Sequence, residues 1–158
     1  MNKKYIPALI FFLLITFLAA FIGNFFTIPN IQDWYASLNK PSFNPPNWLF
    51  GPAWTVLYVL MAVSVFLVWQ KKENPQRGKA LTIYFVQLAL NALWSIIFFG
   101  LHNLGLAFVE IIFLWFFILL TLVNFYKVKK LAGILFMPYL LWVSFAALLN
   151  FAVWQLNM

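Results

Sequence analysis

The sequence has little charge and no cysteine, and both features narrow the class of protein that it encodes. Of its 158 residues only 8% are charged, against roughly 25% in an average soluble domain, while 65% are hydrophobic and the mean hydropathy is +0.92. Without cysteine there can be no disulfide, no thiol chemistry and no thiolate metal site. The composition is that of an integral membrane protein, and the length predicts a single domain over residues 1–158.

Groups that carry acid–base chemistry are also scarce. Three acidic residues and one histidine supply no paired carboxylates, no Ser-His-Asp set and no cluster of metal ligands. Hydrolytic chemistry is therefore nearly excluded, and no metal site is expected. A net charge of +7 would indicate nucleic-acid binding in a soluble protein. Here the basic residues flank apolar runs, as topology determinants do, so no nucleic-acid partner is expected.

Five apolar runs are long enough to cross a bilayer, which takes about 20 residues as a helix. They cover about residues 5–26, 47–70, 80–101, 104–126 and 131–156. Because backbone groups in hydrocarbon must bond to one another, each run is predicted to be helical. The predicted fold class is an all-α integral membrane bundle of five transmembrane helices. Pro138 lies inside the last run and is expected to kink it.

The basic residues divide sharply between the two sides of such a bundle. Nine of the ten lysines and arginines lie in the amino terminus (Lys3, Lys4), in residues 71–79 or in residues 127–130. Only Lys40, in the first loop, lies on the opposite side. The positive-inside rule then predicts a cytoplasmic amino terminus, with the first loop and the carboxyl terminus outside.

The first loop is the longest irregular segment of the sequence. From Trp34 to Trp54 it spans about 20 residues and holds prolines at positions 41, 45, 46 and 52. Proline fixes φ, so the loop is expected to be stiff. Ordered loops longer than about 12–15 residues are usually functional. Its aromatic residues at a membrane boundary favour recognition of a flat, apolar molecule.

Polar and aromatic residues recur at helical spacing on three of the predicted helices. One stripe holds Gln87, Asn91, Trp94 and Phe98; a second holds Tyr139, Trp142, Ala146 and Asn150; a third holds Trp54 and Tyr58. Residues three or four apart share a helix face, so the three stripes could enclose an apolar pocket with a few amide groups. A second interpretation stays open, because such stripes also hydrogen-bond neighbouring membrane helices. Trp69, Trp115 and Trp154 are interpreted as interfacial anchors.

Two titratable residues occupy unusual positions. Glu110 is the only acid within a predicted span. A charge there costs a few kcal/mol, so this carboxyl is expected to be protonated, paired or facing water. A packing hydrogen bond and a functional role both remain open for it. His102 lies in the predicted turn between the third and fourth helices, where a structural role is favoured over axial ligation of haem.

Several blocks of the sequence occur in an order that is specific to one family. They are Trp34–Pro46, Gly51–Trp54 with Tyr58, Gln87–Asn91 with Trp94, Phe98–Gly100, Met137–Trp142, Phe145–Ala146 and Leu149–Asn150. With these blocks the sequence resembles the TspO/translocator protein family, the tryptophan-rich sensory proteins of bacteria and their mitochondrial relatives, once called peripheral benzodiazepine receptors. The resemblance extends over nearly the whole chain.

The resemblance implies a five-helix bundle that forms homodimers in the lipid bilayer. It also implies a pocket, capped by the first loop, that binds porphyrins such as protoporphyrin IX, haem-type tetrapyrroles, sterols and benzodiazepine-like drugs. The porphyrin would be a ligand, and no cofactor is required. Carried over by position, the ligand-binding residues are Tyr35, Pro45, Phe50, Trp54, Tyr58, Asn91, Trp94, Trp142 and Ala146, and Gln87 is added from its stripe. The Lys-, Asn- and Phe-rich composition favours a bacterial cell membrane.

The resulting hypothesis is a membrane receptor or sensor for porphyrins, with two alternatives. The first is light-dependent porphyrin degradation, in which Trp54 and Trp142, at positions that match the family, would donate electrons or trap reactive oxygen. The second is transport of tetrapyrroles or sterols. A dedicated sterol role is disfavoured, because residues 149–155 lack the Tyr and the basic residue of the animal sterol motif. Lys40 could attract a porphyrin propionate at the outer side.

Overall fold

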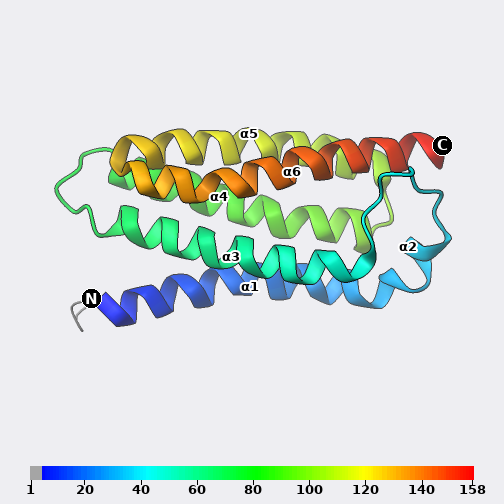
Figure 1. Cartoon of the computed structure of the whole chain (residues 1–158), viewed down its shortest axis with the longest axis horizontal. Helices are drawn as coiled ribbons and strands as arrows, with labels where there is room; N and C mark the ends of the chain where they lie inside the picture. The colour runs from blue at the N-terminus through cyan, green and yellow to red at the C-terminus, as the bar shows by residue number, and fades with distance from the viewer. Residues whose placement is uncertain (1–4) are drawn as a thin grey trace.

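The computed structural model describes residues 5–158, and these form a bundle of five long helices that lie side by side (Figure 1). The long helices are α1 (Ile6–Ile31), α3 (Asn47–Trp69), α4 (Arg77–Ser95), α5 (Leu104–Val128) and α6 (Lys130–Leu156). A short helix, α2 (Trp34–Ser37), lies in the first loop, and a π-helical turn, η2 (Ile96–Gly100), continues α4. Five segments of the described chain, with α4 and η2 taken together, are long and apolar enough to span a membrane. The predicted five-span helical fold is therefore confirmed.

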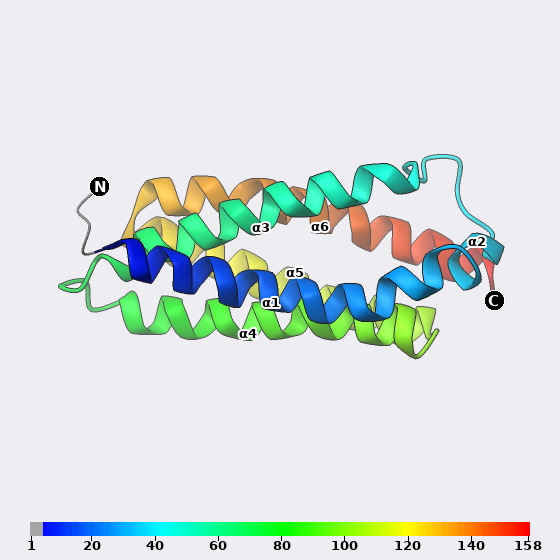
Figure 2. The same ribbon diagram turned by 90° about the horizontal axis from the view of Figure 1, so that it is seen from below.

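α5 packs tightly on both α4 and α6, and α1 and α3 pack against these three helices. The α5–α6 pair makes the most extensive interface and the α4–α5 pair the next, while α1 packs on α3 and α4 and α3 packs on α6. At one end of the bundle, Lys129 alone separates α5 from α6. Seen from below, α1 and α3 diverge toward the end that carries α2 (Figure 2). The cavity described below lies at that end.

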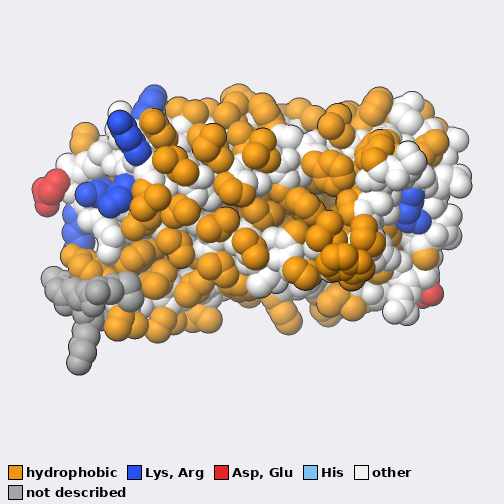
Figure 3. Space-filling view, viewed as in Figure 1, with side chains coloured by type: hydrophobic (Ala, Val, Ile, Leu, Met, Phe, Trp, Pro, Cys, Tyr) orange, Lys and Arg blue, Asp and Glu red, His pale blue; other side chains and the backbone are white. Residues whose placement is uncertain are grey.

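The outer surface is suited to lipid. Large apolar side chains such as Leu14, Phe21, Leu141 and Leu148 are exposed along the helices. Apolar side chains cover the middle of the face drawn in Figure 3, and most of its Lys and Arg side chains gather at the end that holds the amino terminus. Lys3 and Lys4, which were part of the charge argument, lie outside the described residues. In a soluble protein this apolar band would require a partner, and here the bilayer supplies it.

The first helix is longer than predicted. It was expected to end near residue 26, but α1 continues to Ile31 with Pro29 in its last turn. The prediction ended the helix ahead of the proline, whereas proline is here accommodated close to the helix end. Side chains also bond carbonyls in this stretch, because Thr27 Oγ1 donates to the Gly23 carbonyl at 2.9 Å and Asn30 Nδ2 to the Phe26 carbonyl at 2.8 Å.

The remaining boundaries differ by a few residues. α4 begins at Arg77 instead of residue 80. α5 ends at Val128 instead of residue 126, and α6 begins at Lys130 and continues through Pro138 to Leu156. α3 begins at Asn47 as predicted, and α2 occupies residues 34–37, so the irregular part of the first loop is shorter than the segment from Trp34 to Trp54.

Candidate ligand-binding site

A cavity of about 510 Å³ lies within the bundle at the end that carries α2. Side chains of α1, α3, α4, η2, α5 and α6 line it, and Tyr35 of α2 closes part of its outer end. Small-molecule pockets typically enclose about 300–1,000 Å³ and are mostly apolar, with few polar groups. The size and the lining of this cavity fall within that description.

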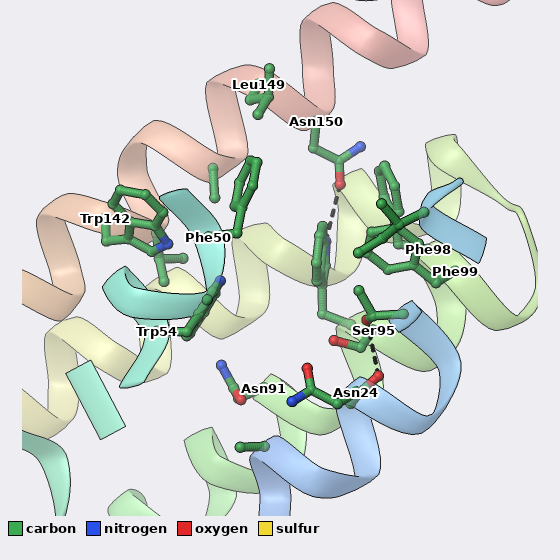
Figure 4. Close-up of a pocket in the computed structure, with 18 of the residues that line it drawn as sticks. Asn24, Phe50, Trp54, Asn91, Ser95, Phe98, Phe99, Trp142, Leu149 and Asn150 are labelled. Carbon is green, nitrogen blue, oxygen red and sulfur yellow. Dashed lines mark hydrogen bonds between the residues drawn. The ribbon is translucent and has the colours of Figure 1, made fainter. Parts of the chain in front are cut away.

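Aromatic rings form one wall of the cavity. Phe50 and Trp54 come from α3 and Trp142 from α6, as Figure 4 shows. Phe50 meets Trp142 edge to face, with 6.2 Å between ring centroids, and Trp54 stacks on Tyr58 at 5.5 Å. These contacts fix the orientation of each ring. The wall presents flat π surfaces to whatever occupies the cavity.

Two consecutive buried hydrogen bonds, from Tyr58 to Asn91 and from Asn91 to Tyr139, bound the inner end of the cavity. The Tyr58 hydroxyl donates to Asn91 Oδ1 at 2.6 Å, and Asn91 Nδ2 donates to the Tyr139 hydroxyl at 2.9 Å. This chain of hydrogen bonds joins α3, α4 and α6. Both predicted roles of the Asn91 stripe therefore hold for one residue, since Asn91 lines the cavity and also bonds neighbouring helices.

Replacing Asn91 with leucine is expected to lower the free energy of unfolding by about 1–2 kcal/mol. Hydrogen bonds between membrane helices average about 0.6 kcal/mol and reach about 1.7, and this change removes two of them and leaves two buried hydroxyls unpaired. Thermal unfolding in detergent would measure the loss. Thr82→Val is the control, because that exposed hydroxyl bonds only the Gly78 carbonyl of its own helix. Equal unfolding midpoints for the two variants would contradict a structural role of the Tyr58–Asn91–Tyr139 hydrogen bonds.

A second asparagine fixes Trp94. The Trp94 indole Nε1 donates to Asn150 Oδ1 at 3.1 Å, and Asn150 Nδ2 donates to the Leu104 carbonyl at 3.0 Å. Trp94 also stacks on Phe98 at 4.9 Å. The π-helical turn widens the helix here and places Phe98 and Phe99 against the cavity. Such turns are frequent at functional sites, and nothing in the sequence pattern indicated this one.

Hydrogen bonds within the first loop, and from the loop to α6, hold it over the cavity. Burial raises the pKa of Tyr35 to about 12, so its hydroxyl stays protonated at neutral pH and donates to Asn44 Oδ1 at 2.8 Å. The side-chain amide of Asn157 accepts from the Asn39 backbone N–H and donates to the Asn39 carbonyl, both at 2.9 Å, which joins the loop to the carboxyl end of α6. Lys40 Nζ donates to two carbonyls of its own loop and does not line the cavity.

The cavity opens sideways between α1 and α3. Its exposed lining residues all belong to these two helices: Asn24 and Ile28 on α1, and Asn47, Trp48, Gly51 and Thr55 on α3. The lining residues contributed by the other helices are buried or partly buried. An apolar ligand in the bilayer could therefore reach the cavity without crossing the first loop.

Eight of the ten predicted ligand-binding residues line the cavity: Tyr35, Phe50, Trp54, Tyr58, Asn91, Trp94, Trp142 and Ala146. Pro45 and Gln87 do not line it. Gln87 lies one helical turn inward from Asn91, fully buried below the Tyr58–Asn91–Tyr139 chain. Pro45 belongs to the loop, where its carbonyl accepts a hydrogen bond from Asn44. Ligand binding by the eight stays a prediction.

Residues of α1 were absent from the predicted site. Gly23, Asn24 and Thr27 line the cavity from this helix, and Ser95 of α4 faces them. The sequence carried one signal for Asn24, because it is an isolated amide in a long apolar run. A signal of that kind shows that the residue needs a polar partner but does not show which one.

The two unusual titratable residues lie outside the cavity. Glu110 is buried on α5, and neither carboxyl oxygen has a hydrogen-bond partner among residues 5–158, so the packing hydrogen bond considered for it is not formed there. His102 stacks on Trp34 with 4.2 Å between ring centroids, and its Nε2 lies 3.0 Å from Asn30 Oδ1. Among the described residues, no group of three or more potential His, Cys, Asp or Glu ligands could hold a metal ion.

Sequence comparisons agree with this architecture. The profile of the TspO/MBR family matches residues 11–155. The chain is 49% identical over 138 residues to the tryptophan-rich protein TspO of Archaeoglobus fulgidus, across 87% of this chain and 88% of that protein. It is 46% identical over 125 residues to protein CrtK of Rhodobacter capsulatus, across 78% of each chain. It is 39% identical over 160 residues to the translocator protein of Homo sapiens, across 99% of this chain and 94% of that protein. The chain belongs to the TspO/MBR family.

Proposed function

We propose that the protein is a membrane receptor that binds porphyrins, such as protoporphyrin IX, in the cavity beneath the first loop. The observation that carries the proposal is the aromatic wall of a cavity of about 510 Å³, formed by Phe50, Trp54 and Trp142. A porphyrin is a flat π system, and offset or edge-to-face contacts with aromatic rings favour such a ligand beyond the area that it buries. The family resemblance points to the same class of ligand.

The hydrogen-bonding groups of the wall also support this ligand class. The Trp94 indole is committed to Asn150, whereas the hydrogen bonds found within residues 5–158 involve neither the Trp54 nor the Trp142 indole N–H. Indole N–H is a donor only, so each of these two groups needs an acceptor when buried. The carboxyl oxygens of a bound tetrapyrrole supply acceptors.

The neutral lining supports one orientation of the ligand within the cavity. The lining residues are all neutral, and an ionised carboxylate buried without a cation is costly. We therefore place the tetrapyrrole ring against the aromatic wall and its propionates toward the opening between α1 and α3. Because that opening faces the bilayer side of the bundle, an amphiphilic ligand arriving in the membrane would enter ring first.

Assembly and orientation complete the proposal. The family resemblance supports a homodimer, and the relatives that share it support placement in a cell membrane. Residues 71–79 and 127–130 lie at the same end of the bundle as the first helix's start, so the positive-inside rule places that end in the cytoplasm. The first loop and the cavity would then face outward.

Titration of the purified protein with protoporphyrin IX in the dark is expected to show saturable binding. Trp54→Phe and Trp142→Phe should each weaken it up to about tenfold, because an aromatic pair contributes about 0.5–1.5 kcal/mol beyond its buried area. The absorbance of the porphyrin is the preferred readout, since removing a tryptophan does not alter it. The control is Trp69→Phe, because Trp69 packs on Phe12 and Phe66 outside the cavity. Absence of saturable binding to the wild type would overturn the proposal.

Illumination of the same samples distinguishes a receptor from a degrading protein. A receptor is expected to leave the porphyrin spectrum unchanged beyond the bleaching seen without protein. Conversion to a new defined product that requires Trp54 and Trp142 would instead establish the degradation alternative.

A further inference from the structure

Basic side chains gather at the end of the bundle where α3 connects to α4 and α5 connects to α6 (Figure 3). The cluster consists of Lys71, Lys72, Arg77, Lys79, Lys127, Lys129 and Lys130. Glu73 is the only acidic residue in these two segments, and all but two of the basic side chains are exposed. The positive-inside rule accounts for the side of the membrane on which they lie, but not for how they are arranged.

Two of these cations converge on one aromatic ring. The Lys72 ammonium lies 5.8 Å and the Arg77 guanidinium 5.9 Å from the centroid of the Trp69 ring, within the range of a cation–π contact. Trp69 is the last residue of α3, and its ring stacks on Phe66 and meets Phe12 of α1 edge to face. The packed ring therefore holds both positive charges at one place at this end of the bundle.

The connection between α3 and α4 keeps this arrangement in place. The Lys72 N–H donates to the Gln70 carbonyl at 3.0 Å. The Arg77 N–H donates to the Asn74 carbonyl at 3.1 Å, and its Nε–H donates to the Trp69 carbonyl at 2.8 Å. A guanidinium has five N–H donors, and the hydrogen bonds found within residues 5–158 use neither the other four nor the Lys72 ammonium. Two cationic groups with unused donors therefore lie beside the same ring.

The surroundings indicate which anion fits these two cations. Tryptophan and basic residues at the ends of spanning helices lie at the level of the lipid headgroups. Further along the neighbouring helices, Ile10 of α1 and Phe85 of α4 are exposed, so lipid chains cover the surface next to the cations. Guanidinium groups bind phosphate through paired N–H donors. Phosphatidylcholine carries its own cation beside the phosphate and phosphatidylglycerol does not, so a positive cluster favours phosphatidylglycerol.

We propose that Lys72 and Arg77, beside Trp69, form a binding site for the phosphate of an anionic phospholipid such as phosphatidylglycerol. The site lies at the opposite end of the bundle from the cavity, and none of these three residues lines the cavity. The inference is therefore independent of the proposed porphyrin binding. The bound lipid would hold this end of the protein at the level of the headgroups.

Native mass spectrometry of the protein, released from micelles that contain phosphatidylglycerol and phosphatidylcholine in equal amounts, tests the proposal. The wild type is expected to retain phosphatidylglycerol in preference. Lys72→Gln and Arg77→Gln should each weaken its binding about fivefold, since one cation near an anionic membrane surface contributes about 1 kcal/mol. Lys127→Gln is the matched control, because this exposed lysine lies at the same end on α5, and it is expected to keep most of the preference. Comparing two lipids within each variant separates lipid recognition from any change in stability.

Each other outcome overturns the proposal or its site. Equal retention of the two lipids by the wild type would contradict recognition of an anionic lipid. Wild-type preference in both Lys72→Gln and Arg77→Gln would overturn the assigned residues. An equal loss in these variants and in Lys127→Gln would show attraction spread over the whole cluster. Inorganic phosphate, added at the concentration of the lipid, is expected not to displace it, and displacement would show a site for a free anion instead.

Discussion

Replacing Ala146 with tryptophan is expected to weaken porphyrin binding at least about 100-fold while leaving the bundle folded. Ala146 is a small residue that lines the cavity from α6, one turn from Trp142. An indole at this position would occupy space that the ligand needs. An aromatic side chain displaces about 150 Å² of contact, which at about 25 cal/mol per Å² corresponds to about 4 kcal/mol of lost binding free energy. Titration with protoporphyrin IX would measure the loss.

A tryptophan placed two residues further along the helix provides the control. Leu148 is 65% exposed on the lipid-facing side of α6 and does not line the cavity, so Leu148→Trp is expected to bind as the wild type does. Both variants add a ring of the same size to the same helix. If Ala146→Trp retained wild-type affinity, the porphyrin would have to bind somewhere other than this cavity.

Replacing Gly133 with alanine is expected to lower the free energy of unfolding by about 3 kcal/mol, the upper end of the cost of overpacking. A Cβ on Gly133 would lie 2.6 Å from the Cβ of Tyr126, 2.8 Å from its Cα and 2.9 Å from its backbone nitrogen. Backbone atoms cannot rotate away, so α5 and α6 would have to separate beside their short connection at Lys129. These two helices make the most extensive interface of the bundle.

Another glycine isolates this steric effect from helix propensity. Gly78 lies in the first turn of α4 with no atom within 4 Å of a built Cβ, so Gly78→Ala is expected to be neutral or slightly stabilising. Thermal unfolding of both variants in the same detergent makes the comparison. A Gly133→Ala protein as stable as Gly78→Ala would contradict the close contact between α5 and α6.

The five spans could be predicted from the sequence because hydrocarbon leaves few alternatives. A long apolar run in lipid must be helical, and nine of the ten lysines and arginines lie at ends of runs that share one side of the membrane. The predicted helix ends were less accurate, because local hydrogen bonds and the placement of proline decide where a helix stops. The first span was predicted to end near residue 26, but α1 continues to Ile31 and accommodates Pro29 in its last turn, where Thr27 and Asn30 bond nearby carbonyls.

Helical spacing predicted which helix faces line the site, but it could not predict how far along each face the cavity extends. Asn91 and Gln87 occupy the same face of α4, yet only Asn91 reaches the cavity, since the Tyr58–Asn91–Tyr139 chain closes the space above Gln87. That chain depends on how three helices meet. Spacing along one helix does not contain this information.

The contribution of α1 was missed for a related reason. Its apolar run shows no stripe, and the site residues Gly23 and Asn24 are small or isolated. They matter because α1 touches α4 at Ser95 and diverges from α3, which is a property of the assembled bundle. The family resemblance carried most of the site, and the structure added the wall that lies opposite the tryptophans.

A structure of the protein with bound protoporphyrin IX tests the central claim most directly. The proposal places the ring in the cavity beneath Tyr35, flat against Trp54 and Trp142, with the propionates at the opening between α1 and α3. A porphyrin found on the lipid-facing surface, with the cavity empty or filled by lipid, would contradict the account.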